Sequence, residues 1–128
     1  MKLFFYDGYY MPIVIVNPLT EKRYPNEGEV LALIDTGFNG FLTITKDIFE
    51  ELGCIAYEKA KIIGICCKVA AKKSPIRVAI PELNLTIDGE CLTYDDAKEV
   101  LLGIEALSKL KLILNGCKNE GIAIRCNY

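Results

Sequence analysis

One junction in the sequence constrains the fold more than any other feature: an apolar run that ends directly in an aspartate. Val30–Ile34 carries five apolar residues in succession, which predicts a strand buried on both faces, because side chains alternate between the two faces of a strand. Asp35 follows at once, and an ionised carboxylate there is costly unless it is hydrogen-bonded or shares a proton. Gly37 permits backbone conformations closed to other residues, and Asn39-Gly40 is a turn pair. These residues predict a tight, carboxylate-bearing turn between two strands.

The remaining sequence consists mainly of short extended segments separated by turn residues. We therefore expect an all-β fold, organised as a single domain over residues 1–128, with one or two short helices. The expected strands, besides Val30–Ile34, are Met11–Val16, Phe41–Ile44, Lys61–Ala70, Ile76–Ile80, Leu83–Thr93, Val100–Gly103, Lys111–Leu114 and Ile122–Cys126.

Local signals predict the helices and the turns. Thr45 can cap a helix that runs to Leu52 before Gly53 ends it. A second helix is expected where apolar residues recur at helical spacing after Gly103. The expected turns and loops are Leu19–Tyr24 as an exposed loop, Lys72–Pro75 as a break between strands, and Asp88-Gly89 as a hairpin turn.

Composition excludes several classes of function. Lys and Arg number 15 against 17 acidic residues, so the chain offers no basic field for nucleic acid or anionic lipid. No apolar run is long enough to span a bilayer, and Met1–Tyr10 lacks the apolar centre of a signal peptide, so we expect a cytoplasmic protein without a membrane partner. The chain contains no histidine, which removes Ser/His and Cys/His catalysis.

The six cysteines are interpreted mainly as buried free thiols. None forms a C-x-x-C pair, and without histidine a zinc site would need thiolates alone. We therefore expect neither a metal site nor another cofactor. A cysteine-based redox or metal protein centred on Cys66 and Cys67 is a weaker alternative.

Two motifs in order give the chain a family resemblance. The first motif is the apolar strand with Asp35-Thr36-Gly37. The second is Leu101-Leu102-Gly103 followed by an expected helix, and its glycine stands 68 positions after Asp35. This arrangement resembles the retropepsin-like aspartic proteases, including the small predicted proteases of archaea and bacteria, over about residues 30–114. The resemblance implies a closed acid-protease barrel that is one half of a symmetric homodimer.

The chemistry of such proteases requires two carboxylates that share one proton, one as base to a water and one as acid to the carbonyl oxygen. The other Asp-Gly pair, Asp88-Gly89, lacks the threonine and is expected at a hairpin turn. The chain is also too short to carry both motifs in two lobes. A two-fold axis that pairs Asp35 with its own copy would supply the dyad.

The resemblance also implies roles for the neighbours of Asp35. Thr36 would hydrogen-bond across the two-fold axis, and Gly37 would let the backbone approach the substrate. Leu102 and Gly103 would pack against the catalytic loop, with a strand or helix terminator as the plain alternative for the glycine. The apolar segment that contains Gly64, Ile65 and Cys66 resembles the tip of the family's flap, while a core strand with a bulge at Gly64 is the competing interpretation.

The chain departs from the family pattern in the wall of the cleft. Phe38 stands where Ala or Ser is usual, so its ring must line the substrate cleft or pack beneath it. Asn39 and Ile104 stand where viral members have an ion pair, so the polarity of that subsite does not carry over.

Two hypotheses of different class remain. The first is an endopeptidase that acts on peptide or protein substrates through Asp35 of each subunit. The second is a catalytically silent dimeric binding or scaffold domain with the same fold. The first is favoured because Asp35, Thr36 and Gly37 are all present, where a silent domain would need only the glycine.

Overall fold

The computed structural model describes residues 1–56, 58–63 and 68–126, with side chains given outside residues 57–69. Its elements, in chain order, are β1 (Phe4–Phe5), β2 (Tyr9–Val16), β3 (Arg23–Tyr24), β4 (Val30–Ile34), β5 (Leu42–Thr43), α1 (Lys46–Glu51), β6 (Glu58–Ile63), β7 (Lys68–Ile80), the 3-10 helix η1 (Pro81–Leu83), β8 (Leu85–Thr93), β9 (Leu101–Leu102), α2 (Ile104–Leu107), β10 (Leu110–Asn115) and β11 (Glu120–Arg125).

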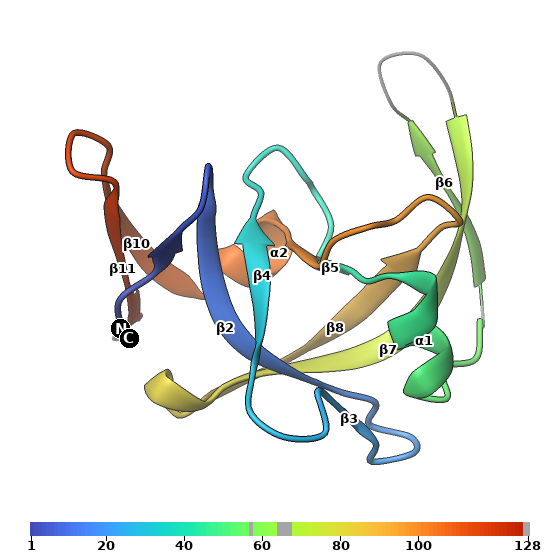
Figure 1. The fold of residues 1–128 in the computed structure, drawn as a ribbon. Helices are drawn as coiled ribbons and strands as arrows, with labels where there is room; N and C mark the ends of the chain where they lie inside the picture. The colour runs from blue at the N-terminus through green and yellow to red at the C-terminus, as the bar shows by residue number, and fades with distance from the viewer. Residues whose placement is uncertain (57, 64–67, 127–128) are drawn as a thin grey trace.

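The principal sheet closes into a barrel (Figure 1). Its strands are hydrogen-bonded in the order β2-β4-β9-β5-β8-β7, and the pairing of Val14 with Ala79 joins β2 back to β7. Most neighbours are antiparallel, but β9 runs parallel to β4 and β8 runs parallel to β5. The expectation of an all-β barrel with short helices is therefore confirmed.

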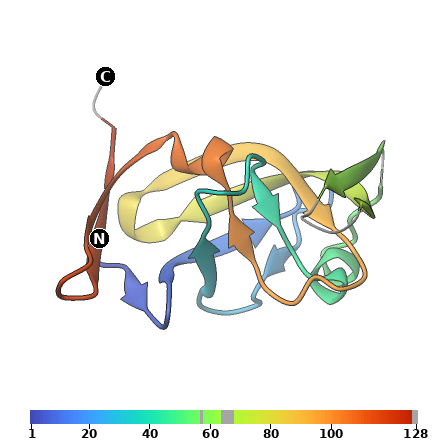
Figure 2. The ribbon, with the colours of Figure 1, turned by 90° about the horizontal axis from the view of Figure 1, so that it is seen from above.

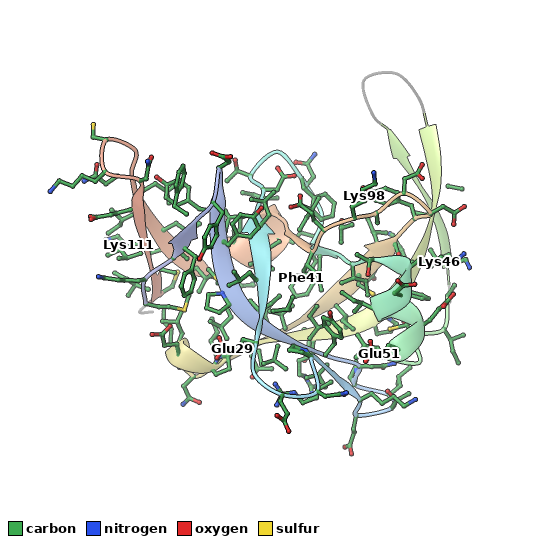
Figure 3. All side chains as sticks on the ribbon, viewed as in Figure 1. Glu29, Phe41, Lys46, Glu51, Lys98 and Lys111 are labelled. Atoms are coloured by element: carbon green, nitrogen blue, oxygen red, sulfur yellow. The ribbon has the colours of Figure 1, made fainter. Side chains whose placement is uncertain are left out.

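The interior of the barrel is one apolar core. Fully buried side chains come from β2, β4, β5, β7, β8 and β9, and the ring of Phe41 lies among them (Figure 3). The largest of the buried apolar side chains are Met11, Ile13, Ile15, Leu42, Ile44, Leu52, Ile76, Ile80 and Leu102. Along β7, burial alternates at Ile76, Val78 and Ile80, as expected of a strand with one buried face, whereas β2 is buried on both faces from Met11 to Ile15.

Helix α1 forms as the local sequence predicts. The Thr45 hydroxyl accepts a hydrogen bond from the amide of Ile48 at 3.3 Å, which satisfies one of the free donors of the first turn. Ile48 and Phe49 face the core. Gly53 then adopts φ +67°, a left-handed conformation that suits glycine at the end of a helix.

The expected hairpin turn at Asp88-Gly89 is wrong. Both residues lie inside β8, where Asp88 pairs with Arg77 and forms an ion pair at 2.7 Å. Gly89 is present because the ring of Phe41 occupies the space of a side chain, with ring carbons 2.5 to 2.6 Å from an ideal Cβ. The turn falls instead at η1, where Asn84 adopts φ +49°.

The expected break at Lys72–Pro75 is also wrong, because β7 runs through it without interruption. β6 pairs with β7 only as far as Lys73, and β2 begins to pair at Arg77. Pro75 therefore lies in a stretch of β7 that has β8 on one side alone, so its missing N–H breaks no ladder.

Two further expectations need correction. The loop over Leu19–Tyr24 ends in the short strand β3, which pairs with β2. Val30–Ile34 does form a strand, but within one chain it is not buried on both faces: Ala32 is fully buried, whereas Leu31 is 38 % exposed. The second face of β4 is therefore partly exposed in the described chain.

The first residues of the chain lie against the β10–β11 hairpin at one side of the barrel (Figures 1 and 2). β10 and β11 form a hairpin. The amide of Leu3 donates to the Gly121 carbonyl at 2.9 Å, and the amide of Ala123 donates to the Met1 carbonyl at 2.9 Å. The N-terminal residues therefore add to β11 of the same chain as a third strand. No helix within the described residues is long and apolar enough to cross a membrane.

Candidate active site

Asp35 is positioned by the parallel pairing of β4 and β9. β4 pairs with β9 through Leu33 with Leu101 and Ile34 with Leu102. The amide of Asp35 donates to the Leu102 carbonyl at 3.0 Å, so this pairing extends to the aspartate itself. The carboxylate thus leaves the barrel at the end of a strand whose backbone is fixed from both sides, since β2 pairs with the other edge of β4.

The turn after Asp35 is built around its carboxylate. The amide of Gly37 donates to Asp35 Oδ1 at 3.0 Å, and the amide of Phe38 donates to the Asp35 carbonyl at 3.2 Å. An ideal Cβ at Gly37 would lie 3.3 Å from Oδ1, so a larger residue would crowd the carboxylate. Asp35 is half-buried and Thr36 is exposed. The carboxylate is therefore fixed in direction, with one oxygen hydrogen-bonded by the turn.

The segment 102–105 supports the turn from below. The amides of Gly103, Ile104 and Glu105 donate to the carbonyls of Phe41, Phe38 and Gly40, at 2.9, 2.9 and 3.1 Å respectively. Leu102 is fully buried between β4 and β5. Two short runs, far apart in the sequence, are thus locked together by backbone hydrogen bonds.

Gly103 lies directly against this loop. A Cβ there would overlap the carbonyl oxygen of Gly40 and come within 2.6 Å of Phe38 Cδ2. The ring of Phe38 also covers Gly40, whose ideal Cβ would lie 2.6 Å from Phe38 Cζ. The large ring at this position therefore packs beneath the loop onto two glycines.

A cleft of about 410 Å³ opens beside the carboxylate. Asp35, Gly37, Phe38 and Asn39 line it, as do three residues that sequence reasoning missed, Thr43, Tyr94 and Leu101. Thr43 and Leu101 are paired across β5 and β9, and Tyr94 follows the end of β8. Leu101 alone carried a sequence signal, because it stands in the second motif. Asp35 is the only carboxylate among the residues that line this cleft.

Gly64, Ile65 and Cys66, the expected flap tip, lie outside the described residues. The strands that flank them are described: β6 and the start of β7 pair from Glu58–Lys73 to Ile63–Lys68. This hairpin projects from the barrel at the same side as the Asp35 loop, the top in Figure 1.

Apolar side chains are exposed near the Asp35 loop and at the chain ends. Phe4 and Phe5 of β1 are 45 and 37 % exposed, and Tyr6, which follows β1, is 62 % exposed. The loop after β1 rises at the top of Figure 1. Ile104, in the segment hydrogen-bonded to the Asp35 loop, is 41 % exposed. Ile113, Leu114, Ile122 and Ile124 of the β10–β11 hairpin are exposed as well. These exposed apolar side chains thus lie in three parts of the chain: β1 with the residue after it, the segment that follows β9, and the β10–β11 hairpin.

Within the residues that the structure describes, no three His, Cys, Asp or Glu side chains converge on a common point that could hold a metal ion.

The chain is similar to known proteins in sequence and in fold. No family model matches the chain. A protein of Archaeoglobus fulgidus, described as uncharacterized, is 37 % identical over 108 residues, which cover 82 % of this chain and 84 % of the relative. The chain belongs to the same family as this archaeal protein.

Two solved structures share the architecture. EIAV protease, determined with the inhibitor HBY-793, superposes with a TM-score of 0.58 at 19 % identity, covering 77 % of this chain and 84 % of that one. A retropepsin-like aspartic protease from Rickettsia conorii superposes with a TM-score of 0.57 at 17 % identity, covering 99 % of this chain and 92 % of its own. The chain has the retropepsin-like fold. The resemblance first seen in two short motifs is confirmed at the level of the fold, and the retropepsin-like barrel is complete within the residues described.

Proposed function

We propose that the chain is an aspartic endopeptidase that works as a homodimer, with Asp35 of each subunit as the catalytic residue. The observation that carries the proposal is the position of Asp35. Its carboxylate is half-buried, hydrogen-bonded by the Gly37 amide at 3.0 Å, and lines a cleft of about 410 Å³ on a retropepsin-like barrel. The solved structures of this fold described above are proteases.

One carboxylate cannot perform the reaction alone. Attack of water on a peptide carbonyl needs a base to take the water proton and an acid to protonate the carbonyl oxygen. Two neighbouring carboxylates that share one proton supply both, because close like charges keep one of them protonated. Among the described residues that line the cleft, Asp35 is the only carboxylate, so the second is proposed to come from the partner subunit.

In the proposed reaction the ionised Asp35 takes a proton from the water, and the protonated Asp35 of the other subunit gives its proton to the carbonyl oxygen. The tetrahedral intermediate then breaks its C–N bond as the now protonated carboxyl gives its proton to the amine and the now ionised carboxylate takes a proton from a hydroxyl of the intermediate. The dyad ends with one proton, as it began, so the carboxylates are regenerated. Thr36 is assigned a hydrogen bond across the two-fold axis, which its exposure permits.

The exposed apolar surface supports the dimer. A symmetric interface that pairs Asp35 with its copy must run beside the Asp35 loop. Ile104 and the aromatic residues of β1 are exposed on that part of the chain, and Leu31 of β4 is 38 % exposed. Gly64, Ile65 and Cys66 are proposed to close over the bound peptide. A cytoplasmic location and the absence of nucleic-acid or membrane partners stay predictions.

The test is a comparison of wild type with Asp35→Asn on a peptide library, with subunit mass measured in parallel. The isosteric amide keeps the size of the side chain and can still accept the Gly37 hydrogen bond, so fold and mass are expected to stay unchanged. Cleavage is expected to disappear, since the amide can neither accept nor share the proton. Equal cleavage by the two proteins would refute the proposal. A wild-type protein that is dimeric and correctly folded but cleaves nothing would favour the silent binding domain.

A further inference from the structure

A second pocket, of about 350 Å³, lies between α1, the start of β7 and the end of β8, and shares Tyr94 with the Asp35 cleft. Phe49 and Ile55 give it apolar walls, and Lys46, labelled in Figure 3, stands at its α1 side. The half-buried Cys54, just beyond the end of α1, forms part of its wall. The proposed peptidase mechanism uses none of these residues.

Cys54 belongs to a buried cluster of side chains that can donate hydrogen bonds to sulfur. Cys54 packs against the core cluster that contains the fully buried Cys91. Asn17 Nδ2 lies 3.9 Å from Cys54 Sγ. Cys91 and Ser74 are fully buried and pair across β8 and β7, so the cluster is held by the barrel itself.

The surroundings of the two cysteines shift their thiol pKa values in opposite directions. The hydrogen bond from Cys91, aided by that from Ser74, lowers the pKa of Cys54 although burial opposes the shift. The contact with Cys54 and burial both raise the pKa of Cys91, so Cys91 keeps its proton. Because the thiolate is the nucleophilic form of cysteine, the reactive sulfur is the one at the pocket wall.

Thr93 gives independent evidence that the pocket takes a polar occupant. Thr93 lines the same pocket and is 3 % exposed, and its Oγ1 finds no hydrogen-bond partner among the described residues. Buried hydroxyls are nearly always hydrogen-bonded, so an unpartnered one favours a small polar molecule nearby.

We propose that Cys54 is a peroxide-reactive thiol that closes onto Cys91 as a reversible disulfide. A small hydroperoxide would enter the pocket, and the Cys54 thiolate would attack its distal oxygen. The O–O bond breaks, the sulfur becomes a sulfenic acid, and the leaving oxygen takes a proton as water or an alcohol.

The second step uses the neighbouring thiol. As the Cys91 sulfur attacks the Cys54 sulfur, the S–O bond breaks and hydroxide leaves with the thiol proton as water. The two sulfurs have then lost two electrons to the peroxide, and a dithiol reductant can return them. The bond joins the end of α1 to the middle of β8 and so closes a long loop.

Tryptic mapping tests the proposal directly, because each relevant cysteine falls in a different peptide. Cys54 lies in residues 47–59, Cys91 in 78–98, and the exposed Cys117 in 112–118. Reduced whole protein is treated with a few equivalents of hydrogen peroxide and digested without reduction. The expected product is peptide 47–59 linked to peptide 78–98, reversed by dithiothreitol. The melting temperature of the oxidised protein should rise by about 5 to 10 °C, because the new bond constrains the unfolded chain.

Two variants separate the steps. In Cys91→Ser, the sulfenic acid on Cys54 should persist and be trapped by a 1,3-dione on peptide 47–59. In Cys54→Ser, Cys91 should stay reduced. Oxidation of Cys117 while 47–59 and 78–98 remain free thiols would overturn the proposal, and so would oxidation of Cys91 in Cys54→Ser. The peptide map of oxidised wild type shows by itself whether Cys117 is oxidised in place of Cys54 and Cys91, so the test stands even if a variant does not fold. None of the outcomes depends on peptidase activity.

Discussion

Substitution of Gly103 by alanine tests how the Asp35 loop is held. The added Cβ would overlap the Gly40 carbonyl oxygen and lie 2.6 Å from Phe38 Cδ2. The main obstacle is backbone, which cannot rotate away as a side-chain tip can. Overpacking of this kind costs about 1–3 kcal/mol. The same movement strains the backbone hydrogen bonds from Gly103, Ile104 and Glu105, each worth about 0.5–1.5 kcal/mol.

We therefore expect Gly103→Ala to lower the free energy of unfolding by about 3 kcal/mol, which corresponds to about 10 °C in melting temperature for a chain of this size. Equilibrium urea denaturation gives the free energy, and a thermal scan gives the midpoint. Gly116→Ala is the matched control, because an ideal Cβ there meets nothing within 4 Å. Its stability should change by no more than about 0.5 kcal/mol. If Gly103→Ala is as stable as Gly116→Ala, the loop is not held by this close approach.

Two further predictions concern the glycine inside β8 and the proposed Asp35 dyad. Gly89→Ala should lower the free energy of unfolding by about 1–3 kcal/mol in urea denaturation, because a Cβ would meet ring carbons of Phe41 at 2.5 to 2.6 Å; a neutral effect would show that the ring moves freely. The proposed dyad predicts a bell-shaped dependence of kcat/KM on pH, with its maximum at acidic to near-neutral pH. With both carboxylates protonated there is no base, and with both ionised there is no acid. A rate that keeps rising into alkaline solution would contradict a shared proton.

Local chemistry made some of these features predictable from sequence. The cap at Thr45 and the stop at Gly53 depend on residues within one turn of helix, so they could be read from the chain alone. The Asp35 turn was also predictable, because an aspartate after an apolar strand needs hydrogen bonds that a neighbouring glycine can provide. The expectation that Leu102 and Gly103 pack against the Asp35 loop came from the family resemblance, since spacing alone does not determine which segments meet.

Tertiary contacts decided the features that were missed. Asp88-Gly89 is a favourable turn pair, but the ring of Phe41, far away in the sequence, requires a glycine inside β8. Pro75 normally interrupts a central strand, yet it falls where β7 has lost β6 and has not reached β2. Tyr94 and Thr43 line the cleft only because β8, β5 and β9 are neighbours in the barrel. A single sequence carries no sign of such contacts.

The most direct test of the shared dyad is a subunit-mixing experiment. Wild type and Asp35→Asn are mixed in equal amounts at constant total concentration and allowed to exchange subunits, and peptide cleavage is then measured. If each active site needs Asp35 from both subunits, only wild-type pairs cleave, and activity falls to about one quarter of that of wild type alone. If one subunit suffices, activity stays at about one half or above. We predict about one quarter; a value of one half would contradict an active site built from two copies of Asp35.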